Sequence, residues 1–184
     1  MQTKICAVIL AAGEGRRFGE PKAFAKIDEV SFLNLSVEKL CSTEVCEVSA
    51  VVKNKVNLNF NKLKEVINSR QDAPMLSSVY EGIKNSGDAD GYLIYPVDYP
   101  FIKKSTLDKL ISEFGNHSES VILPVYNNKK GHPVIIPKSI AVKINGEDVD
   151  GGLDALIKNS DAEICLIDVN DEGVLRNINF KSDL

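Results

Sequence analysis

Three short apolar segments of the chain are each followed by an amphipathic segment with helical spacing. The apolar segments cover residues 4–11, 46–53 and 90–98, and the amphipathic segments cover 31–41, 75–87 and 105–115. Strands that are apolar on both sides belong in a sheet covered on both faces, which is typical of parallel strands joined by helices. The alternation therefore predicts an α/β fold with a mostly parallel sheet and right-handed crossovers.

The remaining sequence predicts shorter elements around this core. Ser31 is placed to cap the helix at 31–41, and Gly115 is placed to end the helix at 105–115. Further strands are expected at 65–68, 120–126, 132–137, 162–169 and 174–180, and short helices near 138–144 and 152–159. The chain has 184 residues without an internal repeat or a linker, so a single domain over 1–184 is expected.

The charge balance argues against a general nucleic-acid-binding surface. Such a surface needs a basic excess, whereas 22 basic and 26 acidic side chains give this chain a net charge of −4. No apolar window reaches the roughly 18 residues of a membrane helix. The first apolar run is preceded by Lys4 alone and followed by Arg16 and Arg17 rather than by a polar cleavage region, which argues against a signal peptide. We therefore expect a cytoplasmic protein with no membrane partner. The four cysteines lack Cys-x-x-Cys spacing and are expected to be reduced thiols.

The turn after the first strand contains three glycines and three basic residues: Gly13, Gly15, Gly19, Arg16, Arg17 and Lys22. The glycines let the backbone adopt positive φ and let a ligand approach it closely. The arginines can bind phosphate oxygens in a bidentate manner, and the lysine adds a point charge. Backbone N–H groups in a turn of this kind can also point at one anion. The turn therefore predicts a polyphosphate site.

Two other interpretations of this turn stay open. It fits a loose Gly-x-Gly-x-x-x-Gly pattern of dinucleotide-binding dehydrogenases, and it does not fit the Walker pattern. Pro21 would disturb a helix that starts at the glycines, and the strand at 46–53 is followed by Asn54 rather than an acidic residue. The remaining interpretation is a solvated basic turn that binds no ligand.

Asp98 ends the apolar strand at 90–98, between Pro96 and Pro100. Ligands of open α/β sheets bind beyond the carboxyl ends of the strands, so Asp98 and the glycine-rich turn are expected to share one cleft. One carboxylate can anchor Mg²⁺ when waters and substrate phosphates complete its coordination. A capping aspartate without a ligand is the alternative interpretation.

Four motifs, in this order along the chain, resemble those of one family. "LAAGEGRRFGEPK" is similar to the opening signature of the molybdenum cofactor nucleotidylyltransferase-like family of NTP transferases. "APMLSSVYEGI" (73–83), "PVDYPFI" (96–102) and "KGHPVIIP" (130–137) resemble its later motifs. The resemblance implies a three-layer sandwich with a mostly parallel mixed sheet, the glycosyltransferase-A-like nucleotide-diphospho-sugar transferase fold.

The resemblance also implies roles for individual residues. The backbone at Leu10, Ala11, Ala12 and Gly13 would contact the base and ribose, Gly15 and Arg16 would lie in the same nucleotide-binding turn, and Ser78 would lie near the base or ribose. Arg17 and Lys22 would serve the triphosphate, Asp98 would bind Mg²⁺ with Asn179 as a second ligand, and His132 would face the acceptor. For His132, a packed histidine between two strands is the alternative.

Several positions depart from the family pattern. The loop serine is Gly15 here, an arginine on the acceptor side is replaced by Asp154, and a late Asp-x-Asp pair is replaced by Asn177 and Asn179. These changes leave the nucleotide half of the site intact and alter the acceptor half. The Ala-Ala-Gly form of the opening turn resembles the cytidylyl-transferring branch and favours CTP.

The expected function is Mg²⁺-dependent transfer of a nucleotidyl group, with cytidylyl favoured, from an NTP to a small phosphorylated acceptor such as molybdopterin. Pyrophosphate would be released. Two alternatives remain. One is a nucleotide-binding accessory protein that has lost transfer activity, and the other is a sugar-phosphate nucleotidyltransferase of the same fold.

Overall fold

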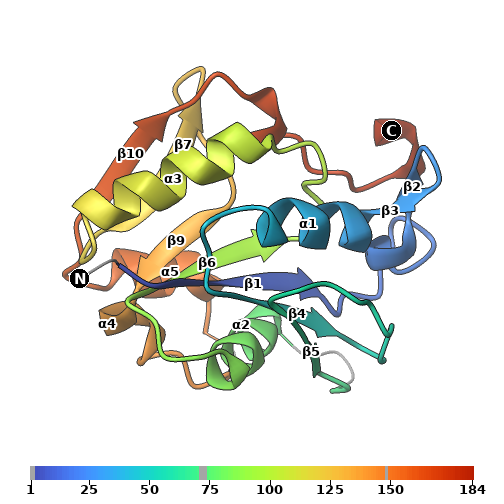
Figure 1. Cartoon of the computed structure of the whole chain (residues 1–184), viewed down its shortest axis with the longest axis horizontal. Coiled ribbons are helices and arrows are strands. Elements are labelled where there is room, and N and C mark those ends of the chain that lie inside the picture. The colour runs from blue at the N-terminus through green and yellow to red at the C-terminus, as the bar shows by residue number, and fades with distance from the viewer. Residues whose placement is uncertain (1–2, 71–73, 148) are drawn as a thin grey trace.

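The structure is a computed structural model that describes residues 3–70, 74–147 and 149–184. Its main sheet contains β1 (Ile5–Ala11), β4 (Glu47–Val52), β5 (Leu63–Ile67), β6 (Gly91–Pro96), β7 (Val121–Tyr126), β8 (Lys129–Lys130), β9 (Val134–Pro137) and β10 (Ile164–Asp168). A separate hairpin is formed by β2 (Lys26–Ile27) and β3 (Val30–Ser31). The strand order of the main sheet is β10-β7-β9-β6-β1-β4-β5, with β8 paired to β7 (Figure 1).

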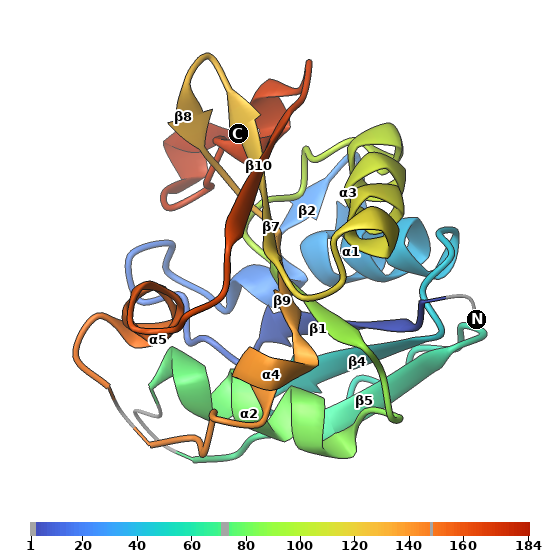
Figure 2. The same ribbon diagram turned by 90° about the vertical axis from the view of Figure 1, so that its left-hand side faces the viewer.

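Five α-helices in the described residues cover the sheet on both faces. They are α1 (Phe32–Cys41), α2 (Met75–Asn85), α3 (Lys104–Asn116), α4 (Lys138–Ala141) and α5 (Gly152–Lys158). Figure 2 shows α1 and α3 over one face and α2, α4 and α5 over the other. Strands β1, β4, β5 and β6 run parallel, while β9 runs antiparallel to both of its neighbours. The predicted three-layer sandwich with a mostly parallel mixed sheet is therefore confirmed.

Strand β1 explains why the first segment of the sequence is apolar along its whole length. It lies between β4 and β6, and both pairings are parallel. Ile5, Ala7 and Ile9 belong to the core beneath α1 and α3, whereas Cys6 and Val8 belong to the core on the opposite face. Because both faces are covered, no position of the strand interior tolerates a charged side chain.

Two helix boundaries test the expected caps. The Ser31 hydroxyl accepts a hydrogen bond of 3.2 Å from the backbone N–H of Asn34, so Ser31 caps α1 as predicted. Helix α3 begins at Lys104 and continues to Asn116, so Gly115 lies inside the last turn rather than after it. Boundary shifts of one or two residues are normal for sequence-based assignments.

The strand expected at 174–180 is wrong. A 3-10 turn, η2 (Glu172–Val174), opens this stretch, and a second one, η3 (Lys181–Asp183), follows it. Val174 and Ile178 are fully buried, and the backbone N–H of Ile178 donates to the carbonyl of Asp98 at 2.9 Å. The apolar spacing that suggested a strand therefore reflects two side chains that anchor an irregular segment across the end of β6.

A buried carboxylate fixes the start of this C-terminal segment. Asp171 accepts hydrogen bonds from the backbone N–H of Lys103 at 2.8 Å, the Thr106 hydroxyl at 2.7 Å and the backbone N–H of Gly173 at 3.0 Å. Only 2% of Asp171 is exposed. The first turn of α3 and the C-terminal segment are thereby joined through one side chain.

Within the described residues, no helix is long and apolar enough to span a bilayer. All four cysteines carry free thiols. Burial raises the pKa of Cys6 to about 11, so this thiol is protonated and unreactive at neutral pH.

Candidate functional site

The glycine-rich turn leaves β1 at Ala11 and folds back on itself before η1 (Lys22–Phe24). The backbone N–H groups of Phe18 and Gly19 donate to the carbonyl of Gly15 at 2.8 and 2.9 Å. Gly15 has φ of +62°, and a Cβ there would lie 1.9 Å from the carbonyl oxygen of Glu20. Gly15 therefore cannot be replaced without moving the turn. The buried ring of Phe18 anchors the turn in the core.

The turn forms one wall of a cleft of about 540 Å³ at the carboxyl ends of β1 and β6. Nine of the predicted site residues line it: Leu10, Ala12, Gly13, Gly15, Arg16, Arg17, Lys22, Ser78 and Asp98. Ala11 is buried in the core beneath α1 instead. The structure thus brings both halves of the predicted nucleotide site to one cleft. Ala73, the first residue of the second motif, lies outside the described residues.

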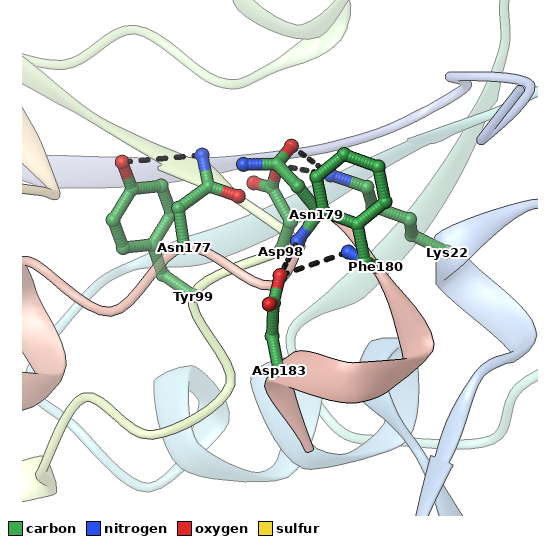
Figure 3. Close-up of polar contacts among 7 residues, drawn as sticks. All are labelled: Lys22, Asp98, Tyr99, Asn177, Asn179, Phe180 and Asp183. Atoms are coloured by element: carbon green, nitrogen blue, oxygen red, sulfur yellow. Dashed lines mark hydrogen bonds and ion pairs between the residues drawn. The ribbon is translucent and has the colours of Figure 1, made fainter. Parts of the chain in front are cut away.

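Lys22 and Asp98 meet inside this cleft. The Lys22 ammonium nitrogen lies 2.9 Å from Asp98 Oδ2 and 3.0 Å from Asn179 Oδ1 (Figure 3). The two charged side chains are only 16% and 20% exposed. The contact joins the opening turn, the end of β6 and the C-terminal segment, which are far apart in the sequence.

The oxygen atoms around Lys22 are suited to a hard divalent cation. Asp98 and Asn179 already converge on one positively charged nitrogen, so their oxygens can approach a common cation. Among the described residues no three His, Cys, Asp or Glu side chains cluster as a metal centre. Mg²⁺ is commonly held by one or two protein oxygens together with substrate phosphates and water. The donor set therefore fits Mg²⁺ bound together with a nucleotide.

Asp183 fixes the position of Asn179. One carboxylate oxygen of Asp183 accepts hydrogen bonds of 2.8 Å from the backbone N–H groups of both Asn179 and Phe180 (Figure 3). These backbone hydrogen bonds hold the pKa of Asp183 below its usual value. Asn179 consequently sits in a tight turn rather than in a loose C-terminal tail.

His132 lies just before β9 and is partly buried. Its ring packs against Tyr99 with a centroid distance of 4.6 Å, and its backbone N–H donates to Val174 at 2.9 Å. Burial lowers the pKa of His132, although the charges of Asp98 and Asp154 act in the opposite direction. The imidazole is therefore neutral at pH 7. It does not line the cleft described above, so packing and acceptor contact both remain interpretations of this residue.

Two buried polar atoms flank Tyr99. His132 Nδ1 and Asn177 Oδ1 have no hydrogen-bond partner within the described part of the chain. Asn177 Nδ2 donates to the Tyr99 hydroxyl at 3.4 Å. Buried polar atoms are normally paired, so these two atoms are candidates for contact with a ligand or an ordered water.

Comparison with known proteins identifies the family. Residues 7–164 match the model of a family described as the MobA-like NTP transferase domain. The chain belongs to this family. The resemblance drawn from the four motifs is thus confirmed.

Two relatives, from Bacillus mycoides (strain KBAB4) and Halalkalibacterium halodurans, are both named "Probable molybdenum cofactor guanylyltransferase". They are 25% identical over 134 residues and 29% identical over 130 residues. The matches cover 70% and 67% of this chain, and 65% and 64% of the relatives. The chain therefore spans just under two thirds of the length of these relatives.

Solved structures share the fold over almost the whole chain. The homologue of Mycobacterium tuberculosis Rv0371c from Mycobacterium sp. strain JC1 has a TM-score of 0.83 at 18% identity, covering 100% of this chain and 94% of that one. Rv0371c itself, in complex with manganese, has a TM-score of 0.73 at 17% identity and covers 91% of this chain and 89% of its own. At such identities the similarity shows the fold alone.

The cleft also contains polar residues that the sequence analysis did not select: Glu14, Lys53, Asn68 and Arg70. Lys53, at the end of β4, and Arg16 both form ion pairs with Glu14, and these contacts lower the pKa of Glu14. The sequence signal for Lys53 was its place just after a strand that is parallel to β1, the same rule that selected Asp98.

Asn68 organises the opposite wall of the cleft. It is buried, and its side-chain amide donates to the hydroxyl of Ser77 at 2.7 Å and to that of Ser78 at 3.1 Å. Arg70 follows it and also lines the cleft. Asn68 therefore fixes the start of α2, where the predicted nucleotide contact Ser78 is located. Asn68 ends the strand expected at 65–68, so the rule that selected Asp98 could also have selected Asn68.

Proposed function

We propose that the protein transfers a nucleotidyl group from an NTP to a small phosphorylated acceptor and releases pyrophosphate. The observation that carries this proposal is the contact of Lys22 with Asp98 inside a cleft walled by the glycine-rich turn. Membership of the MobA-like NTP transferase family supports it. The dehydrogenase alternative loses support, because Pro21 and the short η1 follow the glycines where a dinucleotide-binding helix would start.

The electrostatics of the cleft suit a triphosphate. Arg16, Arg17, Lys53 and Arg70 line it in addition to Lys22. Arginine and lysine side chains at the mouth of a low-dielectric cleft raise the local concentration of anionic ligands, even in a protein of net negative charge. We assign Arg17 and Lys22 to the phosphates, and the backbone from Leu10 to Gly13 together with Ser78 to the nucleoside.

The chemistry assigned to these groups is in-line attack of the acceptor phosphate on the α-phosphorus. An ionised phosphate monoester needs no general base, so the protein acts by positioning and by neutralising charge. Lys22 stabilises the charge that develops on the leaving pyrophosphate. Asp98 and Asn179 would hold Mg²⁺, and when bound the ion supplies further charge neutralisation at the phosphate oxygens. The manganese complex of the structurally similar Rv0371c agrees with a divalent-ion requirement.

A direct comparison of GTP with CTP tests which base the donor nucleotide carries. The relatives are named guanylyltransferases, whereas the Ala-Ala-Gly form of the opening turn favours CTP. The names of the relatives do not support the CTP preference, which stays a prediction from the sequence. Turnover or binding measured with equimolar GTP and CTP separates the two donors.

The acceptor side carries little positive charge. His132 is neutral at pH 7, Asn177 is uncharged, and Asp154 contributes a negative charge. Molybdopterin is the acceptor that the relatives' names suggest, and a sugar phosphate is the alternative within the same reaction class. These same residues favour the second candidate function, a nucleotide-binding accessory protein without transfer activity.

The test measures pyrophosphate release with each NTP across a panel of phosphorylated acceptors, for wild type, Lys22→Ala and Asp98→Ala. Each variant is expected to lose about 100-fold in kcat, the scale of removing one preorganised electrostatic contact to a transition state. Lys26→Ala and Asp108→Ala are matched controls, because each removes an exposed partner of a surface ion pair. Near wild-type turnover in either site variant rejects the assigned roles.

Calorimetry distinguishes the second candidate. A wild-type protein that binds an NTP with a divalent ion but turns over no acceptor is an accessory protein. A protein that binds no NTP under any condition contradicts both candidates.

A further inference from the structure

The side chains of Tyr95 and the partly buried Lys39 hold the loop that runs from Asp98 to α3. The Tyr95 hydroxyl donates to the carbonyl of Tyr99 at 2.7 Å. The Lys39 ammonium, from α1, donates to the carbonyl of Pro100 at 2.9 Å and also to that of Ile102. Three carbonyls within the four residues after Asp98 are thus held by side chains rather than by regular backbone hydrogen bonding.

The backbone of this loop provides little support of its own. Pro100 has no N–H group, and the backbone hydrogen bonds from Tyr99 to Pro96 and from Ile102 to Tyr99 are long, at 3.3 and 3.5 Å. Without Lys39, two inward-pointing carbonyls would lose their donors. Leaving a buried carbonyl unpaired is unfavourable, so the loop would shift to find other partners.

A charged lysine at position 39 carries a desolvation penalty. Burial lowers the pKa of Lys39, because its surroundings disfavour the charged form of the side chain. The nearby carboxylate of Asp171 acts in the opposite direction and offsets part of this cost. An apolar side chain would fill the same space without a desolvation penalty. The stability of α1 alone therefore does not account for a lysine here.

Lys39 and Asp171 have opposite charges and both hold the end of the loop that leads into α3. The ammonium of Lys39 donates hydrogen bonds to the carbonyls of Pro100 and Ile102. The carboxylate of Asp171 accepts a hydrogen bond from the backbone N–H of Lys103, just before α3 begins. The other side of Asp98 is held through its carbonyl by Ile178. The backbone that carries the Asp98 carboxylate is therefore fixed from both directions.

We propose that Lys39 is a positioning residue for Asp98, with Asp171 as its counter-charge. This proposal rests on the proposed function, in which Asp98 holds the divalent ion. Lys39 touches neither nucleotide nor metal. It acts by fixing the loop, so that the Asp98 carboxylate faces the cleft at the position where Lys22 and Asn179 also converge.

The test compares Lys39→Met, which keeps the length and removes the donor, with Lys39→Arg, which keeps charge and donors. Mn²⁺ affinity is measured by calorimetry in the presence of a non-hydrolysable NTP analogue. Outer partners of metal ligands contribute about 10- to 100-fold to metal affinity, and Lys39→Met is expected to lose that much. Lys39→Arg should restore most of it, and binding of the analogue without Mn²⁺ should be unchanged in both variants.

Lys109→Met is the matched control, because Lys109 also donates to a carbonyl, that of Asp168 at 2.8 Å, but on the exposed face of α3. It should keep wild-type Mn²⁺ affinity. Hydrogen exchange without metal gives a readout independent of activity, since Lys39→Met should lose protection at the amides of Tyr99 and Ile102. If Lys39→Met does not fold, Tyr95→Phe removes the third carbonyl contact and should weaken Mn²⁺ binding in the same direction.

The outcomes separate the two proposals. Wild-type protein without metal-dependent NTP binding rejects the proposed function and, with it, the role of Lys39. Wild-type protein that binds Mn²⁺ with the analogue, alongside a Lys39→Met variant of equal affinity and equal amide protection, rejects the positioning role alone.

Discussion

Replacing Asp171 by alanine tests whether one buried carboxylate joins the C-terminal segment to α3. The side chain is almost fully buried and accepts three hydrogen bonds, from Lys103, Thr106 and Gly173. Alanine would leave these three donors without their acceptor and would remove the negative charge near Lys39. The segment that carries Asn177 and Asn179 would then lose its first anchor.

The expected cost follows from the number and type of contacts. Hydrogen bonds to a charged group contribute about 1.5–3 kcal/mol each, so three give roughly 4.5–9 kcal/mol before desolvation is counted. Burying the carboxylate costs several kcal/mol, which the alanine variant recovers. The net loss should therefore be about 3–5 kcal/mol, the size measured when one partner of a buried charged pair is removed. This is a large share of the roughly 5–15 kcal/mol by which domains are stable.

Urea unfolding followed by circular dichroism measures this loss. With a slope of about 2 kcal/mol per molar urea, the midpoint should fall by roughly 1.5–2.5 M. Asp171→Asn should not rescue the variant, because either orientation of the amide turns an NH₂ group toward an N–H or O–H that now donates to the carboxylate. Asp168→Asn, an exposed change on β10, should stay within about 0.5 kcal/mol of wild type. A loss below about 1 kcal/mol in Asp171→Ala would show that water replaces the carboxylate and that the anchor is not essential.

Two further predictions concern packing and pH. Gly82→Ala would put a Cβ 2.2 Å from a side-chain atom of Val8 in β1 and should destabilise the protein by about 1–3 kcal/mol. A Cβ at Gly115 would have no atom within 4 Å, so Gly115→Ala should stabilise the protein by up to about 1 kcal/mol. Equal effects of the two variants in urea unfolding would contradict this reasoning. Burial holds the pKa of His132 below 6.5, so its unfolded form takes up a proton first and its contribution to stability is lost as the pH falls below that value. His132→Gln should therefore flatten the fall in unfolding free energy from about pH 7.5 to 5.5, and the same change at the exposed His117 should not.

Much of the candidate site could be predicted from the sequence, because its central parts lie where strands end. Gly15, Lys22 and Asp98 each follow an apolar strand, and parallel strands bring their carboxyl ends to one edge. Lys53, directly after β4, obeys the same rule and lines the same cleft. Asn68 also ends an expected strand, but its role depends on hydroxyl groups of α2 that only the fold brings near.

The C-terminal segment shows why sequence spacing failed there. Val174 and Ile178 have the spacing of buried residues, and spacing alone does not distinguish a strand from an irregular segment packed on the core. A strand needs a free sheet edge with matching register, and this segment instead donates from Ile178 to the backbone of Asp98. Asn179 reaches Lys22 only because the chain takes this path.

The sequence by itself determined most of the strands and helices, the mostly parallel α/β class and the glycine-rich turn, because periodicity and glycine conformation are local properties. Tertiary structure alone decided the insertion of antiparallel β9 between β6 and β7, and the contacts of Lys22 with Asp98 and Asn179. It also decided the place of Lys39, which the sequence presents as an ordinary helix lysine. Its ammonium meets the loop after Asp98 only when α1 and β6 pack together, so its role depends on contacts between residues distant in the chain.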